Sequence, residues 1–427
     1  MQNQPASQDP RFSALYKTND ADLIAARSLD VSLNIIAGGK TAVGKEITVE
    51  QTSHAFLFGS NGFGTIPLVN GMLEGEEKVL AEKYTEQILG LCNFVTLPFY
   101  WGGFEPKRGE PNTKAIMNTA HWFKDKGLTV KGHPLCWHTL CAPWLLEMDN
   151  AEILQTQLSR IERDVTDFKG VIDMWDVINE AVIMPIFDKY DNGITRVCNE
   201  IGRINLIRKT FEEARKANPN ATLLINDFDY TSPYEILIEG CLEAGIPIDC
   251  IGIQSHMHQG YWGVEKTLQI LERYERFGLP IHFSETTIIS GDLMPSEIVD
   301  LNDYQVETWP STPEGEERQA HEVTLHYRTL FSRKLVKGIT WWDLIDGHWL
   351  KAPAGLIRAD CSAKPAYNEL VKLIKDEWWG KKTTLKADSS GTIRFRAFAG
   401  TYEVSADGKK TRVEIDGDGS VSLSAAL

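Results

Sequence analysis

The sequence contains no long apolar run and too few basic residues to balance its acidic ones. No segment approaches the roughly 20 apolar residues of a membrane span, and the opening MQNQPASQDP lacks the charged-then-apolar pattern of a signal peptide. Lys and Arg number 44 against 59 Asp and Glu, which leaves a net charge of −15. Because this charge repels phosphate backbones and anionic lipid, we expect no nucleic-acid partner and no membrane partner. The protein is expected to be either cytoplasmic or a mature form whose signal has been removed.

Cysteine pairs and the common cofactor motifs are also scarce. The seven Cys are scattered, and the closest pair, Cys136 and Cys141, lacks the second pair that a zinc site requires. Contact between Cys241 and Cys250 is conceivable, but a disulfide framework is not expected at this density. The motifs HExxH and GxSxG are absent, and GSNGFG has neither GxGxxG spacing nor a P-loop Lys. We therefore expect no cofactor, no metal ion and no serine-hydrolase triad.

Short apolar runs alternate with longer helical patterns from about residue 54 to 376. Stretches such as GEEKVLAEKYTEQILGL repeat apolar residues at spacings of three and four, as amphipathic helices do. Eight such alternations predict an α/β protein with a closed (β/α)8 TIM barrel. The rival, an open doubly wound sheet, usually has a Gly-rich phosphate turn after its first strand. The predicted strands are residues 55–59, 94–99, 129–136, 174–178, 223–227, 250–254, 281–285 and 338–342.

The two ends of the chain have a different pattern. Residues 31–53 predict a β-hairpin around a Gly-rich turn, and the chain after residue 379 alternates apolar and polar residues between Gly and Asp turns. We expect three parts, with both ends pairing into one small accessory β-layer: an N-terminal segment (1–53), the barrel (54–379) and a C-terminal β-module (380–427). Phe395, Phe398 and Tyr402 could bind carbohydrate, but the alternation in RFRAFAGTYEV favours burial of one face.

Two glutamates lie at predicted strand ends, where the active residues of such barrels stand. The fourth strand ends in WDVINEA, which places Asn179 and Glu180 at the mouth, and the seventh ends in IHFSET, which places Glu285 there. A single Glu at such a position is most often a solvated loop residue. Two carboxyls on different sides of one mouth are what glycoside hydrolysis requires, because one protonates the leaving oxygen and the other attacks the sugar or activates water.

Histidine, amide and indole side chains follow the other predicted strands. Indole faces stack on the C–H faces of pyranose rings, while amides and imidazoles hydrogen-bond to hydroxyls. Any one of these side chains alone could equally be a satisfied structural residue. The candidates are His133, Trp137 and His138 after the third strand, Gln254, His256 and His258 after the sixth, and Trp341, Trp342 and Trp349 after the eighth.

Together these motifs resemble glycoside hydrolase family 10, the endo-1,4-β-xylanases of the Asn-Glu (clan A) barrels. The resemblance spans roughly residues 20–376 and rests on GHPLCWH, WDVINEA, GIQSHM, the SE of FSET, and WWDLIDGHWL with the later GLI and KPAY. It implies that Glu180 is the acid/base and Glu285 the nucleophile. It also implies that Asn179 holds the sugar 2-hydroxyl, that His256 orients Glu285, and that the protein is secreted or periplasmic. The cleft would be lined by His133, Trp137, His138, Gln254, Trp342 and Trp349.

The chain departs from the family pattern after three strands. After the seventh strand, Thr286 and Thr287 replace the usual Leu-Asp, and after the fifth, Phe228 replaces a Tyr on the leaving-group side. The largest departure follows the second strand, where the family's Glu-Asn-x-x-Lys-Trp grips the sugar on the non-reducing side. The same place here is Thr96-Leu97-Pro98-Phe99-Tyr100-Trp101.

This departure removes a carboxylate, an amide and an ammonium group from the subsite. Tyr100 takes the place of the Lys, and we expect it to line the vacated space with Leu97 and Phe99 and to contact substrate. Such a pocket would favour stacking or a bulkier, less polar group. In the alternative, other loops supply replacement polar contacts and linear xylan remains the best substrate.

The sequence thus predicts a retaining glycoside hydrolase that cleaves β-1,4-linked xylan or a related decorated β-glycan. Its partner is the polysaccharide or oligosaccharide substrate, and a monomer is favoured. Two alternatives stay open: a family-10-like β-glycosidase with a rebuilt non-reducing-side subsite and another substrate, and a barrel that binds polysaccharide without cleaving it. The presence of both Glu180 and Glu285 argues against the second.

Overall fold

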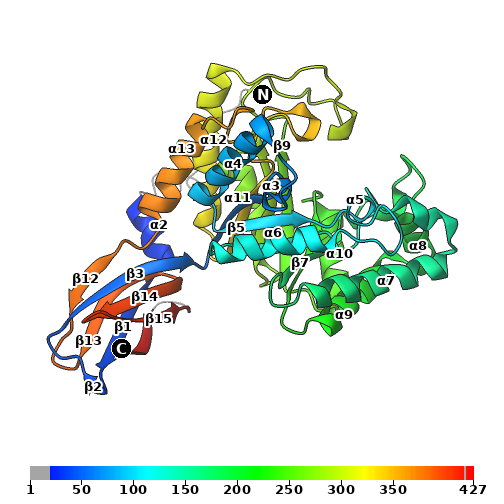
Figure 1. The fold of residues 1–427 in the computed structure, drawn as a ribbon. Coiled ribbons are helices and arrows are strands. Elements are labelled where there is room, and N and C mark those ends of the chain that lie inside the picture. The colour runs from blue at the N-terminus through cyan, green and yellow to red at the C-terminus, as the bar shows by residue number, and fades with distance from the viewer. Residues whose placement is uncertain (1–19, 418–419) are drawn as a thin grey trace.

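A computed structural model describes residues 20–417 and 420–427, which form a closed eight-stranded barrel with a β-module at one end (Figure 1). The barrel order is β10-β11-β4-β5-β6-β7-β8-β9, and the neighbouring strands are parallel. Each of the eight predicted apolar runs overlaps one of these strands, so the predicted (β/α)8 TIM barrel is confirmed. The strands are β4 (Leu57–Asn61), β5 (Phe94–Pro98), β6 (Thr129–His133), β7 (Met174–Asn179), β8 (Thr222–Asp227), β9 (Cys250–Met257), β10 (Ile281–Ile288) and β11 (Val336–Trp341).

Helices connect the strands and cover the barrel. The longer helices are α4 (Gly75–Leu91), α6 (Thr113–Asp125), α7 (Asn150–Asp167), α8 (Gly193–Ile201), α9 (Arg203–Ala217), α10 (Ser232–Glu243), α11 (Gly263–Glu275) and α12 (Pro313–Phe331). The short ones are α2 (Asp20–Arg27), α3 (Thr65–Val69), α5 (Trp101–Phe104), α13 (Pro365–Val371), the π-helix η6 (Lys372–Glu377), and the 3-10 turns η2 (Pro143–Glu147), η3 (Met184–Ile186), η4 (Leu301–Asp303) and η5 (Trp349–Lys351). Within the described ranges, no helix is long and apolar enough to cross a membrane.

Local sequence sets where the helices begin and how closely the strands approach. The side chain of Asp149 accepts the N–H of Glu152 at 2.8 Å and so caps α7, whose apolar face is buried. Between β6 and β7, a Cβ at Gly132 would lie 2.2 Å from the Trp175 ring, so only glycine allows this approach. Close packing at this point holds the end of β6 against β7, beside the barrel mouth.

The two chain ends pair with each other, as predicted, but they form two sheets instead of one β-layer. One sheet has the order β13-β1-β16, with β2 paired to β1, and the other has the order β12-β3-β14-β15. The predicted hairpin is therefore only the short β1–β2 pair, because the second long strand, β3, joins the other sheet. The sheets share a core separate from that of the barrel. The strands are β1 (Ser28–Ala37), β2 (Lys40–Thr41), β3 (Glu46–His54), β12 (Thr383–Lys386), β13 (Thr392–Phe398), β14 (Gly400–Ala406), β15 (Lys409–Ile415) and β16 (Ser420–Ala426).

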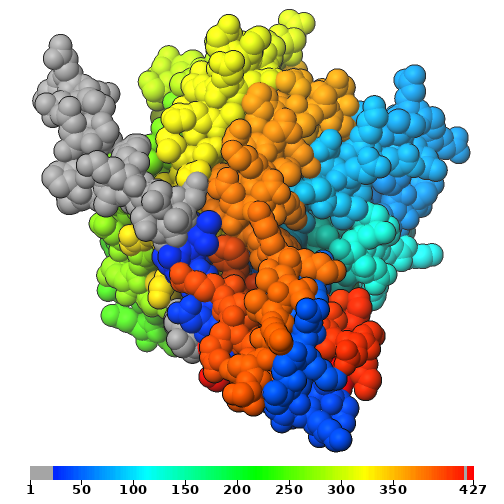
Figure 2. Space-filling model, turned by 90° about the vertical axis from the view of Figure 1, so that its left-hand side faces the viewer, coloured from blue at the N-terminus to red at the C-terminus, as the bar shows by residue number. Residues whose placement is uncertain are grey.

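This β-module packs against the end of the barrel opposite the mouth. Phe331, at the end of α12, stacks on Trp378 with ring centroids 4.2 Å apart and lies 6.2 Å from Phe398 of the module. In Figure 2 the blue, orange-red and red parts of the module gather at the lower end of the molecule. Phe398 and Tyr402 are 6% and 2% exposed. Two of the three aromatic side chains considered for carbohydrate binding are therefore buried inside the protein. The boundaries 53/54 and 379/380 stay predictions.

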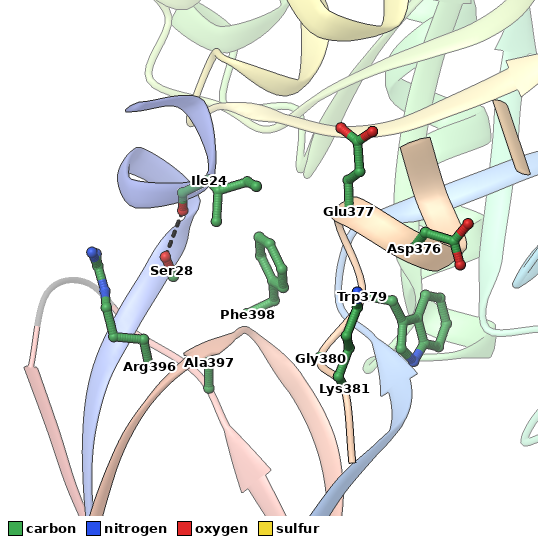
Figure 3. Close-up of a pocket in the computed structure, with 10 residues that line it drawn as sticks. All are labelled: Ile24, Ser28, Asp376, Glu377, Trp379, Gly380, Lys381, Arg396, Ala397 and Phe398. Atoms are coloured by element: carbon green, nitrogen blue, oxygen red, sulfur yellow. Dashed lines mark hydrogen bonds between the residues drawn. The ribbon is translucent and has the colours of Figure 1, made fainter. Parts of the chain in front are cut away.

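A cavity of about 510 Å³ lies at the junction of the module and the barrel (Figure 3). Its walls contain charged side chains of both signs, including Asp376 and Arg396, beside the apolar Ile24 and Phe398. None of the predicted active-site residues lines it. It is a product of module docking, far in the fold from the two candidate glutamates.

Candidate active site

The two predicted carboxyls stand at the barrel mouth, at the carboxyl ends of β7 and β10. Glu180 directly follows β7 with φ of 56°, and its backbone N–H donates to the Asn226 carbonyl at 2.8 Å. This left-handed conformation costs about 1 kcal/mol or more for a non-glycine residue, so tertiary contacts hold Glu180 in it. Glu285 lies within β10, beside a shift in its register with β9.

The Glu180 carboxyl is half-buried among groups that donate to it. The indole N–H of Trp137 donates to Oε2 at 2.8 Å, while amides of Asn179 and Gln254 donate to Oε1 at 3.2 and 3.4 Å. Burial, together with the carboxylates of Asp227 and Glu285, raises the pKa of Glu180 to about 8, although the hydrogen bonds from Trp137 and Gln254 oppose the rise. A raised pKa suits a group that must give up a proton near neutral pH.

The Glu285 carboxyl is 6% exposed and is held by an imidazole and an amide. Oε2 lies 3.2 Å from Nε2 of His256, and Oε1 accepts from the Asn226 amide at 3.2 Å. Burial lowers the pKa of His256 to about 3, so the neutral ring contributes a hydrogen bond and no charge. Burial raises the pKa of Glu285 to about 7, although His133 and Lys131 lower it. Glu180 therefore has the higher pKa of the two carboxyls, and both values are raised.

One chain of amides joins the two carboxyls. The Nδ2 group of Asn226 donates to Oδ1 of Asn179 at 2.7 Å and to Glu285, and Asn179 in turn donates to Glu180. Gln254 adds a second donor to Asn179 Oδ1 at 3.1 Å. The carboxyls and their predicted neighbours Asn179, Gln254 and His256 thus form one connected site. Asn226 was not predicted, although Phe228, two residues later, was identified as a departure from the family pattern.

A buried charge cluster supports His133 from inside the barrel. Nδ1 of His133 donates to Oδ2 of Asp176 at 2.7 Å, and Lys131 lies 2.6 Å from the same oxygen. Although burial opposes it, Lys131 and His133 lower the pKa of Asp176. The ring is thereby oriented with Nε2 toward Glu285, 3.8 Å from Oε1.

Aromatic rings form the walls on either side of the pair. Tyr100 lies 5.7 Å from Trp137 and 5.6 Å from His133, and Trp342 lies 5.4 Å from His133, all as distances between ring centroids. On the other side, Trp349 lies 4.7 Å from His256. These ring contacts place four of the predicted aromatic residues around the carboxyls, namely Tyr100, Trp137, Trp342 and Trp349.

Three of the candidate side chains are almost fully buried, and among the described residues they form no hydrogen bond with either carboxyl. His138 is 1% exposed, with its ring centroid 4.5 Å from that of Phe187. Trp341 is fully buried and donates to the Ala354 carbonyl, and His258 is fully buried near Trp309. Their burial matches the structural role that sequence analysis left open for single aromatic and imidazole residues.

The expectation for the end of β5 is partly wrong. Leu97 and Phe99 are fully buried and belong to the barrel–helix core, where Phe99 lies 4.8 Å from the Trp175 ring and 4.9 Å from Phe104. They do not line the subsite, because alternate residues of a barrel strand face the helices. Only Tyr100 turns toward the mouth.

Polar residues from other strands lie near Tyr100 instead. Asn61, the last residue of β4, donates its amide to Oδ1 of Asp343, which follows β11. Neither residue was predicted. Asp343 could have been suspected from its place two residues after β11, between Trp342 and an apolar pair, but nothing near Asn61 in the sequence connects the two.

The arrangement brings two carboxyls together with amide, imidazole and aromatic side chains at one mouth. Among residues 20–417 and 420–427, no cluster of three or more His, Cys, Asp and Glu side chains could hold a metal ion. Each of the seven Cys is unpaired, Cys241 and Cys250 included.

Comparison with known proteins agrees with this arrangement. The profile of glycosyl hydrolase family 10 matches residues 70–373. An endo-1,4-beta-xylanase of Geobacillus stearothermophilus is 28% identical over 55% of this chain and 72% of its own length, and endo-1,4-beta-xylanase B of Thermotoga neapolitana is 29% identical over 48% and 61%. The crystal structure of xylanase 10B from Thermotoga petrophila in complex with xylobiose has the same fold, with a TM-score of 0.61 at 23% identity over 76% of this chain and 95% of that one. Since the family profile spans well over half of the sequence, the chain belongs to glycosyl hydrolase family 10.

Proposed function

We propose that this protein is a retaining glycoside hydrolase that cleaves β-1,4-linked xylan, or a related decorated β-glycan, by double displacement. The observation that carries the proposal is the pair of carboxyls in one amide network, with a pKa of about 8 for Glu180 and about 7 for Glu285. Xylan is favoured as the polymer because the relatives described above are xylanases.

In the first step, the ionised Glu285 attacks the anomeric carbon while Glu180 gives its proton to the glycosidic oxygen. The C–O bond to the leaving group breaks, and an ester forms between the sugar and Glu285. Trp137 and Gln254 hold the Glu180 carboxyl in place, and His256 and Asn226 do the same for Glu285.

In the second step, Glu180 takes a proton from water, which attacks the same carbon and releases Glu285. Esterification has removed the charge of Glu285 by then, so one of the negative charges that raised the pKa of Glu180 is gone. The group that was an acid can then act as a base. Two displacements at one carbon retain its configuration.

A second candidate is a family-10 β-glycosidase with another or substituted substrate. The observation that favours it is the changed end of β5, where Tyr100 and the buried Leu97 stand in place of two polar groups. A barrel that binds polysaccharide without cleaving it has no need for two carboxyls joined by one amide network, so we do not favour it.

A reducing-sugar assay on linear xylan, substituted xylans and β-glucans tests the proposal. We expect the protein to release products from xylan, and we expect NMR to show that these products retain the anomeric configuration. Cleavage of another β-glycan alone would replace xylan with that substrate. If the protein binds these polymers but cleaves none of them, the non-catalytic alternative is correct.

A further inference from the structure

The carboxyl of Asp343 is a charged group at the mouth that the two displacement steps do not use. It is 9% exposed and accepts the amide of Asn61, while His348 Nδ1 lies 3.9 Å from its other oxygen. Burial raises its pKa, and the His348 imidazole and the backbone N–H of Trp349 only partly oppose this rise. Burying a carboxylate in this way is costly. Such a group therefore calls for a role beyond chain packing.

The barrel order places this carboxyl on one side of the catalytic pair. Strands β11, β4 and β5 are neighbours, so Asp343, Asn61 and Tyr100 project from adjacent strand ends. The Phe63 ring contacts both Tyr100 and Trp342, the residue before Asp343, with ring centroids 5.9 and 5.5 Å apart. Burial raises the pKa of Tyr100, and the Glu285 and Asp343 carboxylates add to this effect. Within the described ranges, the Tyr100 hydroxyl has no hydrogen-bond partner in the protein.

These three side chains carry the chemistry that is missing from the end of β5. The family pattern there supplies a carboxylate, an amide and a cationic donor, whereas this chain has Thr96, Leu97 and Tyr100. A carboxylate (Asp343), an amide (Asn61) and a hydroxyl donor (Tyr100) lie together on the same side of the mouth, but they come from three strands. A carboxylate can accept hydrogen bonds from two neighbouring hydroxyls at once, and these bonds are stronger than those to a neutral acceptor.

We propose that Asp343, fixed by Asn61, binds a pair of neighbouring hydroxyls of the sugar on the non-reducing side of the cut, with Tyr100 as a companion donor. This inference rests on the proposed function and identifies which residues bind the sugar hydroxyls on that side. It favours a glycone with free neighbouring hydroxyls over one that is substituted there. Burial raises the pKa of Asp343 to about 6, so the carboxylate is ionised at the neutral pH where the catalytic pair would work.

The test measures binding separately from turnover. Calorimetry with xylobiose and xylotriose, in a Glu285→Gln background, gives Kd for the parent and for Asp343→Asn. We expect Asp343→Asn to weaken binding about 10- to 100-fold, and Tyr100→Phe about 3- to 10-fold, as for hydrogen bonds to charged and neutral groups. Removing the contacted hydroxyl from the ligand should make parent and Asp343→Asn bind equally, whereas a purely structural role would weaken all ligands alike.

Asp346→Asn is the matched control on the same loop. Its carboxylate bonds to Lys364 and to the Gly355 N–H, so its loss should lower Tm without a ligand-specific change in Kd. If Asp343→Asn behaves in that way, or if the parent binds no xylo-oligosaccharide, the inference is wrong. If Asp343→Asn does not fold, Asn61→Ala is measured instead. We expect this variant to lose at least fivefold in affinity, and an unchanged Kd would contradict the inference. Weakened binding without any turnover of xylan by the wild type would leave this inference standing and overturn the proposed function.

Discussion

Glu285 should be indispensable, because its carboxylate forms the covalent bond to the sugar in the first step. Replacing it with Ala is expected to lower kcat on aryl glycosides by about 10,000-fold or more. Azide can then enter the vacated space and attack from the same face, so the product should be a glycosyl azide of inverted configuration, identified by NMR. Near-native activity of Glu285→Ala would show that the nucleophile has been misassigned.

The contribution of Glu180 to the glycosylation rate should grow with the need of the leaving group for protonation. Glu180→Gln keeps the shape of the side chain and can still accept from Trp137, but it has no proton to donate. For glycosides with poor leaving groups, we expect the glycosylation rate to fall about 100-fold or more, whereas dinitrophenyl glycosides should change by less than about threefold. Pre-steady-state kinetics separates the two steps. Equal losses for both leaving groups would argue against Glu180 as the acid.

The pKa values of the pair predict a bell-shaped dependence of kcat/KM on pH. The active form has Glu285 ionised and Glu180 protonated, so activity should fall below pH 7 as Glu285 takes up a proton and above pH 8 as Glu180 loses one. The Glu180→Gln variant, assayed on a dinitrophenyl glycoside, should lose the alkaline limb and keep the acid limb. An alkaline limb that persists in this variant would place the titration elsewhere.

Loops after β7 and β10 meet across the mouth through an ion pair. Lys189, in the loop that follows Glu180, lies 2.6 Å from both Asp300 and Asp303, in the loop that follows β10. This contact spans the ends of β8 and β9, over the side where Gln254 and His256 lie. We expect a sugar chain that extends toward that side to meet this ion pair.

Lys189→Ala should therefore improve turnover of polymer relative to short substrates. Exposed ion pairs contribute little, so the expected gain in kcat/KM on xylan over an aryl xylobioside is about two- to fivefold. Salt up to about 0.5 M should narrow this difference by screening the wild-type pair. Lys216→Ala, which removes an exposed Lys paired with Glu213 and Glu162 on the helical surface, is the control. A Lys189→Ala ratio equal to that of Lys216→Ala would mean that the contact does not restrict polymer.

At the scale of elements, apolar runs predicted every barrel strand because buried parallel strands are short and rich in Val, Ile and Phe. The end of β5 was harder to predict. Thr96 and Tyr100 were identified as replacements, but which of the intervening residues face the mouth depends on where the strand stops alternating. Leu97 and Phe99 face the helices, and no local pattern indicates this, since both faces of a barrel strand are apolar.

For the whole molecule, the β-module should act as a structural part of the barrel rather than as a separate sugar-binding unit. Deleting residues 381–427 would remove β12 to β16 and leave β1 and β3 with exposed edges and an exposed apolar core. We expect a lower Tm and a lower soluble yield, measured by thermal melting and expression. The converse result, a stable truncated protein that loses only its binding to insoluble xylan, would support a carbohydrate-binding role.

The sequence alone determined the eight β/α repeats and the pairing of two glutamates at one mouth. Both follow from local patterns, because the carboxyl ends of parallel strands in a barrel always converge on one face. Tertiary structure alone decided three features: the contact of Asn61 with Asp343 across 282 residues, the ion pair of Lys189 with the distant loop, and the division of the chain ends into two sheets. These depend on how the barrel closes and which strands become neighbours. Such long-range contacts leave no periodic pattern in a single sequence.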